Sequence, residues 1–204
     1  MKTHSVITII GWLVAGILLF LWQEKYLPFH YEYMEQFRLF HYSSGYFIEH
    51  CSYPSGLIKY MASFLLQFFS QPYMGTGTIT ILLLFIGIGM QQIFKRIASH
   101  VNLPLAYLLP VLFLLCAGMD FNYHLEGTLA FALTVWLLNV QIRIIRPIHR
   151  IFSGILLSWV LYYLAGPAFV LFALCTVIYE WHKRELSKTV SVLILPLAVL
   201  PACY

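Results

Sequence analysis

Residues 147–181 read PIHRIFSGILLSWVLYYLAGPAFVLFALCTVIYEW, and this stretch decides the fold. A bilayer hydrocarbon core about 30 Å thick needs about 20 apolar residues per helical crossing, so the stretch is too long for one ordinary crossing. Gly166 and Pro167 interrupt it near the middle, where proline removes a backbone donor and glycine relaxes the turn. Basic residues flank both ends, and two basic flanks on one side of a membrane require an even number of crossings. The stretch therefore predicts a helical hairpin with crossings at 147–165 and 167–181, and a single kinked helix is the alternative.

The rest of the chain has the same apolar character. Of the 204 residues, 61% are hydrophobic and 10% are charged, against roughly 25% charged in an average soluble domain, and the mean hydropathy is +0.81. Further apolar runs predict crossings at 6–22, 75–94, 103–119, 127–142 and 189–204. The expected fold class is therefore all-α, a polytopic transmembrane protein with about seven crossings. No repeat or linker divides residues 1–204, so we expect one membrane domain, and its apolar last run suggests the N-terminal part of a longer chain.

Charge and cysteine content exclude some classes of protein. The net charge is +4, but the basic residues are scattered between apolar runs, so a nucleic acid is not an expected partner. The four cysteines share no spacing typical of a metal site or a disulfide framework. Membrane lipids are the expected partners, and the sequence leaves the oligomeric state open.

The distribution of charge predicts the orientation of the chain. With a cytoplasmic N-terminus, nine of the twelve basic residues fall on the cytoplasmic side: Lys2, Lys95, Arg96, Arg143, Arg146, Arg150, Lys183, Arg184 and Lys188. The outer side then holds six of the eight acidic residues: Glu24, Glu32, Glu35, Glu49, Asp120 and Glu126. Because basic loops prefer the cytoplasmic side, we expect a multi-pass protein of the bacterial inner membrane with its N-terminus inside.

A long outer loop, residues 23–74, separates the first two expected crossings. Residues 31–41 are expected to form a short helix. Residues 57–69 are expected to form an interfacial or re-entrant helix, because Lys59, Ser63 and Gln67 recur every four residues beside a broad apolar face. Many aromatic residues in this loop are typical of headgroup depth. The loop is interpreted either as an interfacial anchor or as a groove for a lipid-linked sugar.

The candidate catalytic residues are carboxylates of the two outer loops. Glu35 beside apolar surface could act as a general base or help to hold a divalent cation, or it could simply pair with Arg38 at a solvated helix edge. Asp120 begins a second polar group in which His124 and Glu126 follow at alternate positions. That group suits a metal or sugar-hydroxyl site, or Asp120 caps a helix there. The expected substrate-binding residues are Glu32, Arg38, His124, Lys59 and Gln67. The metal, if one binds, is not defined, although a divalent cation suits this chemistry.

Several short patterns resemble an uncharacterised family of multi-pass inner-membrane proteins from Bacteroidota, known as a domain of unknown function. These patterns are Glu35-Gln36-Phe37, Tyr46-Phe47, Pro54-Ser55-Gly56-Leu57, Phe64-Leu65-Leu66-Gln67-Phe68-Phe69, Asn122-Tyr123-His124 and Leu164-Ala165-Gly166-Pro167. The layout of one crossing, a long acidic outer loop and many short crossings is also similar to the C-type glycosyltransferases. That resemblance implies a polyprenyl-phosphate sugar as donor and a loop carboxylate, Glu32 or Glu35, for metal binding or acceptor activation. The usual acidic pair of that loop is absent here.

These observations lead to three functional expectations. The first is a glycosyltransferase-like protein that acts on a lipid-linked sugar at the outer face. The second is a non-catalytic membrane assembly or scaffold subunit. The third, a transporter, would require charged residues along a path through the membrane, and the expected crossings carry none at their centres. We further expect Glu35, Asp120 and His124 to border one outer cavity that the helix at 57–69 covers.

Overall fold

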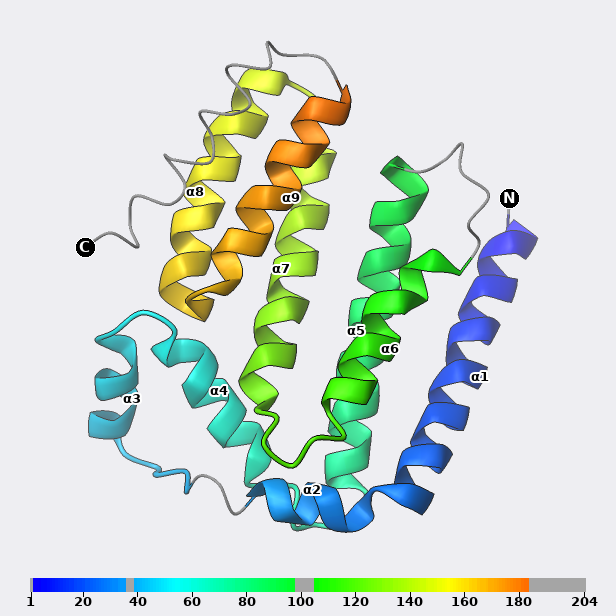
Figure 1. Ribbon diagram of the computed structural model, residues 1–204, viewed down its shortest axis with the longest axis vertical. Coiled ribbons are helices and arrows are strands. Elements are labelled where there is room, and N and C mark those ends of the chain that lie inside the picture. The colour runs from blue at the N-terminus through cyan, green and yellow to red at the C-terminus, as the bar shows by residue number, and fades with distance from the viewer. Residues whose placement is uncertain (1, 36–38, 98–104, 184–204) are drawn as a thin grey trace.

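The computed structural model describes residues 2–35, 39–97 and 105–183, and all the regular structure in this part of the chain is helical (Figure 1). The elements are α1 (Lys2–Tyr26), α2 (Pro28–Glu35), α3 (Ser44–Cys51), α4 (Gly56–Leu66), α5 (Met74–Ile97), η1 (Ala106–Leu108), α6 (Leu109–Ala117), α7 (Leu125–Arg143), α8 (Pro147–Ala165) and α9 (Ala168–Lys183). The long helices run up and down, while α2, α3 and α4 gather at one end of the bundle. We call this the α2–α4 end, and the end where α5, α7 and α9 finish is the opposite end.

Among the residues that the structure describes, four helices are long and apolar enough to cross a membrane: Val6–Tyr26, Met74–Ile97, Leu125–Arg143 and Pro147–Ala165. The expected number of seven crossings is not confirmed. In the described part of the run at 103–119 the helices are η1 and α6, whose twelve residues rise about 20 Å at most, well short of a hydrocarbon core of about 30 Å. Helix α9 has 16 residues, and the expected crossing at 189–204 lies outside the described residues.

The hairpin predicted from Gly166 and Pro167 is confirmed, since α8 ends at Ala165 and α9 begins at Ala168. Gly166 has a φ of +57°, a left-handed conformation that residues with a side chain rarely adopt. A Cβ at this position would lie 2.8 Å from Cβ of Ser55, in the turn before α4. The Ser55 N–H also donates to the carbonyl of Tyr163 at 2.9 Å. The α8–α9 turn therefore rests directly on the turn between α3 and α4 (Figure 1).

Helix α7 is the centre of the bundle, because it packs against α4, α5, α8 and α9. Its contact with α5 is close: a Cβ on Gly89 would approach Cγ1 of Val135 to 2.6 Å. Asn139 uses that approach to donate its side-chain amide to the carbonyl of Gly89 at 2.9 Å. The core around α7 includes Leu125, Leu129, Val135, Leu138, Leu161, Phe169 and Phe172.

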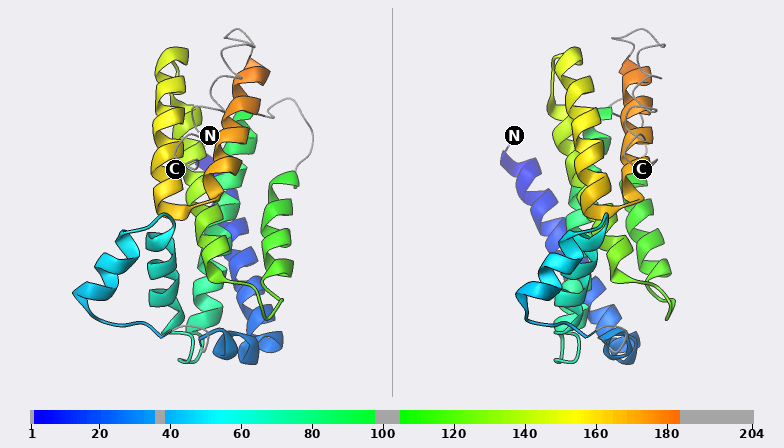
Figure 2. Two further views of the ribbon diagram at one scale, coloured as in Figure 1. Left: turned by 60° about the vertical axis from the view of Figure 1, so that its left-hand side comes forward. Right: turned by 90° about the vertical axis from the view of Figure 1, so that its left-hand side faces the viewer.

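Helix α1 packs mainly on α5, and Figure 2 shows that its N-terminal part leans away from the other helices. At the α2–α4 end, a buried hydrogen-bond chain ties α1 to its neighbours: Gln23 of α1 donates to the hydroxyl of Thr80 in α5 at 3.1 Å and accepts from the hydroxyl of Tyr31 in α2. Burial and the nearby carboxylate of Glu24 raise the pKa of the Tyr31 phenol above its ordinary range. This clamp fixes α2 across the end of the bundle.

The short helices of the long loop differ in part from the prediction. The helix expected at 31–41 begins earlier, at Pro28, because proline suits the first turn of a helix. It ends at Glu35, and residues 39–43 are not helical. The helix expected at 57–69 is α4, which ends at Leu66. Its face of Ile58, Ala62 and Leu66 packs inward, and Ser63 is buried with its hydroxyl donating to the carbonyl of Lys59 at 2.9 Å.

Candidate functional site

A cavity of about 520 Å³ lies between α4, the start of α7 and the α8–α9 turn. Lys59 of α4 and Glu126 of α7 are the charged side chains on its wall. The remaining lining residues are Ser55, Ile58, Gly127, Ala130, Phe131, Thr134, Ala165, Pro167, Ala168 and Leu171. We call this space the polar cavity, because it brings a cation and an anion together between apolar walls.

The position of Lys59 depends on the way α4 begins. Ser55 has a left-handed φ of 66° and precedes the helix, and its carbonyl accepts the backbone N–H of Lys59 at 3.2 Å. The Lys59 ammonium lies 5.4 Å from the ring centroid of Tyr53, a favourable cation–aromatic distance. Both features keep the lysine in the first turn of α4, next to the α8–α9 turn.

Glu126 occupies the first turn of α7. Unpaired backbone N–H groups give a helix N-terminus a partial positive charge, which favours a carboxylate there. Helix α4 packs against both α7 and α8, so it holds Lys59 over the same cavity that Glu126 lines. Sequence reasoning placed Glu126 in the second outer loop but did not select it, because Lys59, the other charged residue of the cavity, comes from a distant part of the chain.

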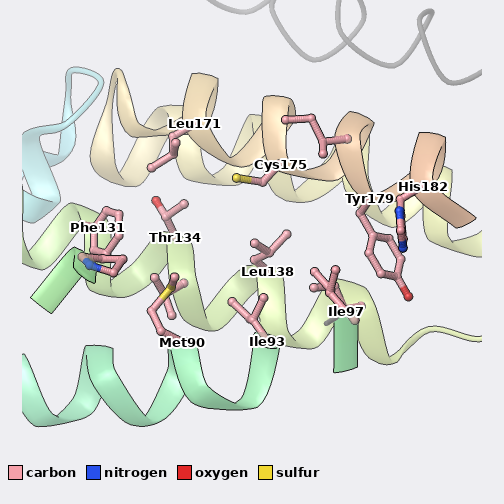
Figure 3. A pocket seen from close by; sticks show the side chains of 14 residues that line it. Met90, Ile93, Ile97, Phe131, Thr134, Leu138, Leu171, Cys175, Tyr179 and His182 are labelled. Atoms are coloured by element: carbon pink, nitrogen blue, oxygen red, sulfur yellow. The ribbon is translucent and has the colours of Figure 1, made fainter. Parts of the chain in front are cut away.

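A second cavity, of about 450 Å³, continues along the bundle toward the opposite end. Figure 3 shows α9 residues Leu171, Cys175 and Tyr179 on one side, α7 residues on the next, and Met90, Ile93 and Ile97 of α5 facing them. Pro110 of α6 and His182 at the end of α9 also line it. We call it the apolar cavity, since aliphatic and aromatic side chains make most of its wall.

The polar and apolar cavities share part of their walls. Phe131, Thr134 and Leu171 line both. The hydroxyl of Thr134 donates to the carbonyl of Ala130 at 2.8 Å, so its hydrogen-bonding demand is met within α7. In the shared part of the two walls, the hydroxyl hydrogen of Thr134 is therefore already bonded within the protein.

The other expected site residues lie elsewhere. Asp120 is exposed, and its carboxylate accepts the backbone N–H of Asn122 at 2.9 Å, which makes it a turn residue and not the cap of α7. His124, the residue just before α7, is exposed, as is Glu32 on α2. Gln67 follows α4 and accepts a hydrogen bond from the hydroxyl of Tyr42. None of these four residues lines the polar cavity.

Two of the expected site residues have side chains that lie outside the described part of the structure. Arg38 lies outside the described residues, and Glu35 ends α2 with a side chain that also lies outside them. The convergence of Glu35 with Asp120 and His124 on one cavity therefore stays a prediction. Among the residues that the structure describes, no group of three His, Cys, Asp or Glu side chains is arranged to hold a metal ion.

An ion pair between α8 and α9 was missed by the sequence analysis, which counted Arg150 among the basic flanks. The Arg150 side chain is 1% exposed, and it pairs with Glu180, which is fully buried. One guanidinium nitrogen lies 2.8 Å from the Glu180 carboxylate, and another donates to the carbonyl of Ile144 at 3.1 Å. Gln141 of α7 adds a hydrogen bond to the Arg150 carbonyl. Because these groups satisfy one another, the network joins three helices and provides no open polar path.

These features define a class: an all-helical protein whose helices have the length and composition of membrane spans, with a charged cavity between apolar walls near one end. Within that class, the chain belongs to the family described as a family of unknown function (DUF6057), whose model matches residues 3–204. The expectation of an uncharacterised family is thereby confirmed. No curated protein and no solved structure matches the chain.

Proposed function

We propose that this protein is a glycosyltransferase-like membrane protein that binds a lipid-linked sugar in the polar cavity, at the outer face of the bacterial inner membrane. The observation that carries the proposal is that Lys59 and Glu126 both line this cavity. An ammonium group is a natural partner for a phosphate, and a carboxylate accepts hydrogen bonds from sugar hydroxyls. Apolar walls strengthen both interactions, because they lower the local dielectric constant.

The same two groups suit the chemistry of sugar transfer. In the proposed reaction, an acceptor hydroxyl attacks the anomeric carbon, the bond from that carbon to the phosphate oxygen breaks, and the lipid phosphate leaves. Glu126 would take the proton of the attacking hydroxyl as general base. Lys59 would stabilise the negative charge of the departing phosphate. Glu35 and Asp120 remain the predicted loop carboxylates, with a divalent cation as their predicted cofactor.

The proposed orientation rests on charge. Helices α5, α7 and α9 finish at the opposite end with basic residues in their last turns: Lys95, Arg96, Arg143, His182 and Lys183. Basic residues at helix ends favour the cytoplasmic side of a membrane. The α2–α4 end, with the polar cavity, would then face outward, where a flipped lipid-linked sugar is accessible.

The test uses the full chain, purified and reconstituted in phosphatidylcholine vesicles, with radiolabelled polyprenyl-phosphate glucose as probe. Lys59→Ala is expected to weaken binding of the probe by roughly tenfold to hundredfold, since a hydrogen bond to a charged group contributes about 1.5–3 kcal/mol. Lys25→Ala is the matched control, because Lys25 is an exposed cation at the same end of the bundle. Equal losses in both variants, or none in Lys59→Ala, would exclude a specific site.

Catalysis is tested by transfer of the label to an acceptor. Glu126→Gln keeps the shape of the side chain and removes its charge, so it is expected to retain probe binding and lose transfer. Glu49→Gln alters an exposed carboxylate of α3 and should have no effect. Loss of transfer in Glu35→Gln or Asp120→Asn, with Glu126→Gln active, would move the reaction to the loop carboxylates. Binding without transfer in every protein would favour the scaffold alternative.

A further inference from the structure

The apolar cavity borders the surface of the bundle along α9. Ile178 and Leu171 line it, yet their side chains are 64% and 41% exposed. On the α7 side, by contrast, the lining residues Leu138 and Ile142 are buried. The cavity is therefore a groove whose rim is α9 and whose floor is α7. Since α5 and α7 have the length and composition of membrane spans, the groove would face lipid in a membrane.

The length of the groove matches one leaflet of a bilayer. Its wall on α7 extends from Phe131 to Ile142, and at about 1.5 Å per residue the helix rises about 16 Å over this range. One leaflet is half of a hydrocarbon core of about 30 Å and has nearly the same depth. The volume of about 450 Å³ is typical of ligand pockets. An acyl chain whose head group lies near Ile142 can therefore fill the groove without leaving its own leaflet.

The wall of the groove accepts a lipid tail but does not select one lipid over another. Its side chains are mostly aliphatic and aromatic (Figure 3). Lipid tails are as apolar as these side chains, so moving a tail from the bilayer into the groove gains no hydrophobic free energy. The tail supplies only the van der Waals contacts that an unfilled groove would lose. Any selectivity must come from the head group.

Two cations border the groove at the end near Ile142. Arg143 follows Ile142 directly, is exposed, and donates to the side-chain carbonyl of Gln92 in α5 at 3.1 Å. A guanidinium group has five N–H donors, so this hydrogen bond does not prevent Arg143 from binding a phosphate oxygen as well. The Lys183 ammonium lies 5.9 Å from the ring centroid of Tyr179, which is also a wall residue. The end of α7 and the end of α9 thus each place a cation beside the same groove.

The charge at this end is complementary to an anionic head group. Glu180, the acidic residue of α9, is buried and neutralised by Arg150, so it does not offset Arg143 and Lys183. A cytoplasmic location explains why basic residues gather at this end of the bundle, but it does not require them to border an apolar groove. Basic pockets between membrane helices are typical binding sites for the head groups of anionic phospholipids.

We infer that the apolar cavity is a binding site for an anionic phospholipid, with one acyl chain in the groove and the phosphate at the end bordered by Arg143 and Lys183. The inference is independent of the proposed function, because it uses neither Lys59 nor Glu126. In the proposed orientation, the lipid belongs to the cytoplasmic leaflet.

Cys175 reports whether a tail fills the groove, because its thiol is free and lies on the wall. The full chain, with Cys51 and Cys203 replaced by alanine, is purified in dodecyl maltoside and labelled with N-ethylmaleimide. Dioleoyl phosphatidylglycerol at about ten times its Kd is expected to slow labelling of Cys175 about tenfold, since about one site in ten then stays empty. Labelling of Cys116, an exposed residue that does not line the cavity, is the internal control and should not change. Absence of protection by phosphatidylglycerol would overturn the site.

The head group is tested with dioleoyl phosphatidylcholine, which has the same tails and no net charge. Each basic residue near an anionic lipid strengthens binding roughly fivefold, so phosphatidylcholine is expected to need a roughly twenty-five-fold higher concentration for the same protection of Cys175. Equal protection by the two lipids would overturn the assignment to an anionic phospholipid.

The two cations are tested by single variants at the surface of the protein. Arg143→Gln and Lys183→Gln should each weaken protection by phosphatidylglycerol roughly fivefold and leave protection by phosphatidylcholine unchanged. Arg146→Gln is the matched control, because it removes an exposed cation at the same end, in the turn between α7 and α8. An equal loss in Arg146→Gln would indicate attraction to the whole basic surface and would overturn a defined site.

A second copy of the chain is the competing occupant of the groove. Ile178→Cys, in a protein whose four cysteines are replaced by alanine, places a thiol on the exposed rim. With phosphatidylglycerol present and copper phenanthroline as oxidant, the protein is expected to remain monomeric. Disulfide-linked dimers that phosphatidylglycerol does not prevent would assign the groove to a second copy and overturn the lipid site.

Discussion

Arg150 is a buried cation whose charge is neutralised by one partner. Removing Arg150 leaves Glu180 fully buried without its partner, and breaking a buried ion pair in this way costs about 3–5 kcal/mol. We therefore expect Arg150→Met to lower the free energy of unfolding by about that amount, measured by detergent denaturation. Arg150→Met combined with Glu180→Met should recover most of the loss, because no charge is then stranded. A double variant as unstable as the single one would contradict this account.

Gly166 is a second residue whose identity is fixed by its surroundings. Alanine there would have to adopt a left-handed φ and would also approach Ser55, so Gly166→Ala should lower stability by about 1–3 kcal/mol. Gly45→Ala is the matched control: it lies in α3 with nothing near its Cβ position, so it should be neutral or slightly stabilising. Adding Ser55→Gly should restore part of the loss, because it removes the opposing Cβ. Equal thermal stability of Gly166→Ala and Gly45→Ala would argue against the turn-to-turn contact.

Helix α2 depends on the Tyr31 clamp, and this dependence should be visible in the effect of pH. The pKa of Tyr31 is higher in the folded protein than its ordinary value of 10.0. The stability from the neutral phenol is present below about pH 10 and is lost as pH rises toward the folded pKa, because the unfolded chain releases its proton first. We expect Tyr31→Phe to weaken the loss of stability above pH 10, measured as the melting temperature against pH. An unchanged slope would contradict this.

At the scale of the helices, the sequence predicted where a helix is broken but did not predict how long each helix is. The α8–α9 hairpin followed from Gly166-Pro167, which breaks a helix whatever surrounds it. The apolar run at 103–119 resembled a crossing, but its described helices, η1 and α6, cover only Ala106–Leu108 and Leu109–Ala117, so the length of an apolar run does not fix the length of a helix. The position of α2 depends on Gln23 and Thr80, two contacts that come from other helices.

At the scale of the whole molecule, the proposed orientation predicts which end faces the periplasm. Cys51 at the end of α3 should react with a membrane-impermeant maleimide added outside intact cells. Arg146→Cys, an exposed position between α7 and α8 at the opposite end, should react only after the inner membrane is opened. Cys116, Cys175 and Cys203 are replaced by alanine in both proteins, and Cys51 is replaced as well in the Arg146→Cys protein. Labelling of Cys51 only from the cytoplasmic side would reverse the orientation.

The candidate site was predictable only in part, because it depends on how helices from distant parts of the chain pack in the whole molecule. Lys59 was identified because it lies on a polar stripe of a short helix, which is a local pattern. Its position on the same cavity as Glu126 depends on the packing of α4 against α7, and one sequence contains no signal for that contact. Asp120 was identified from a different local pattern, polar residues at alternate positions from 120 to 126, but its carboxylate is engaged by its own turn.

The Arg150–Glu180 pair has a consequence for biosynthesis. Arg150 lies in the first turn of α8 and Glu180 lies near the end of α9, so both charges belong to the same end of the helical hairpin. A ribosome delivers Arg150 thirty residues before Glu180, so the arginine has to wait for its carboxylate until nearly all of α9 has been synthesised. We therefore expect the buried pair to form only when the two helices come together as a hairpin.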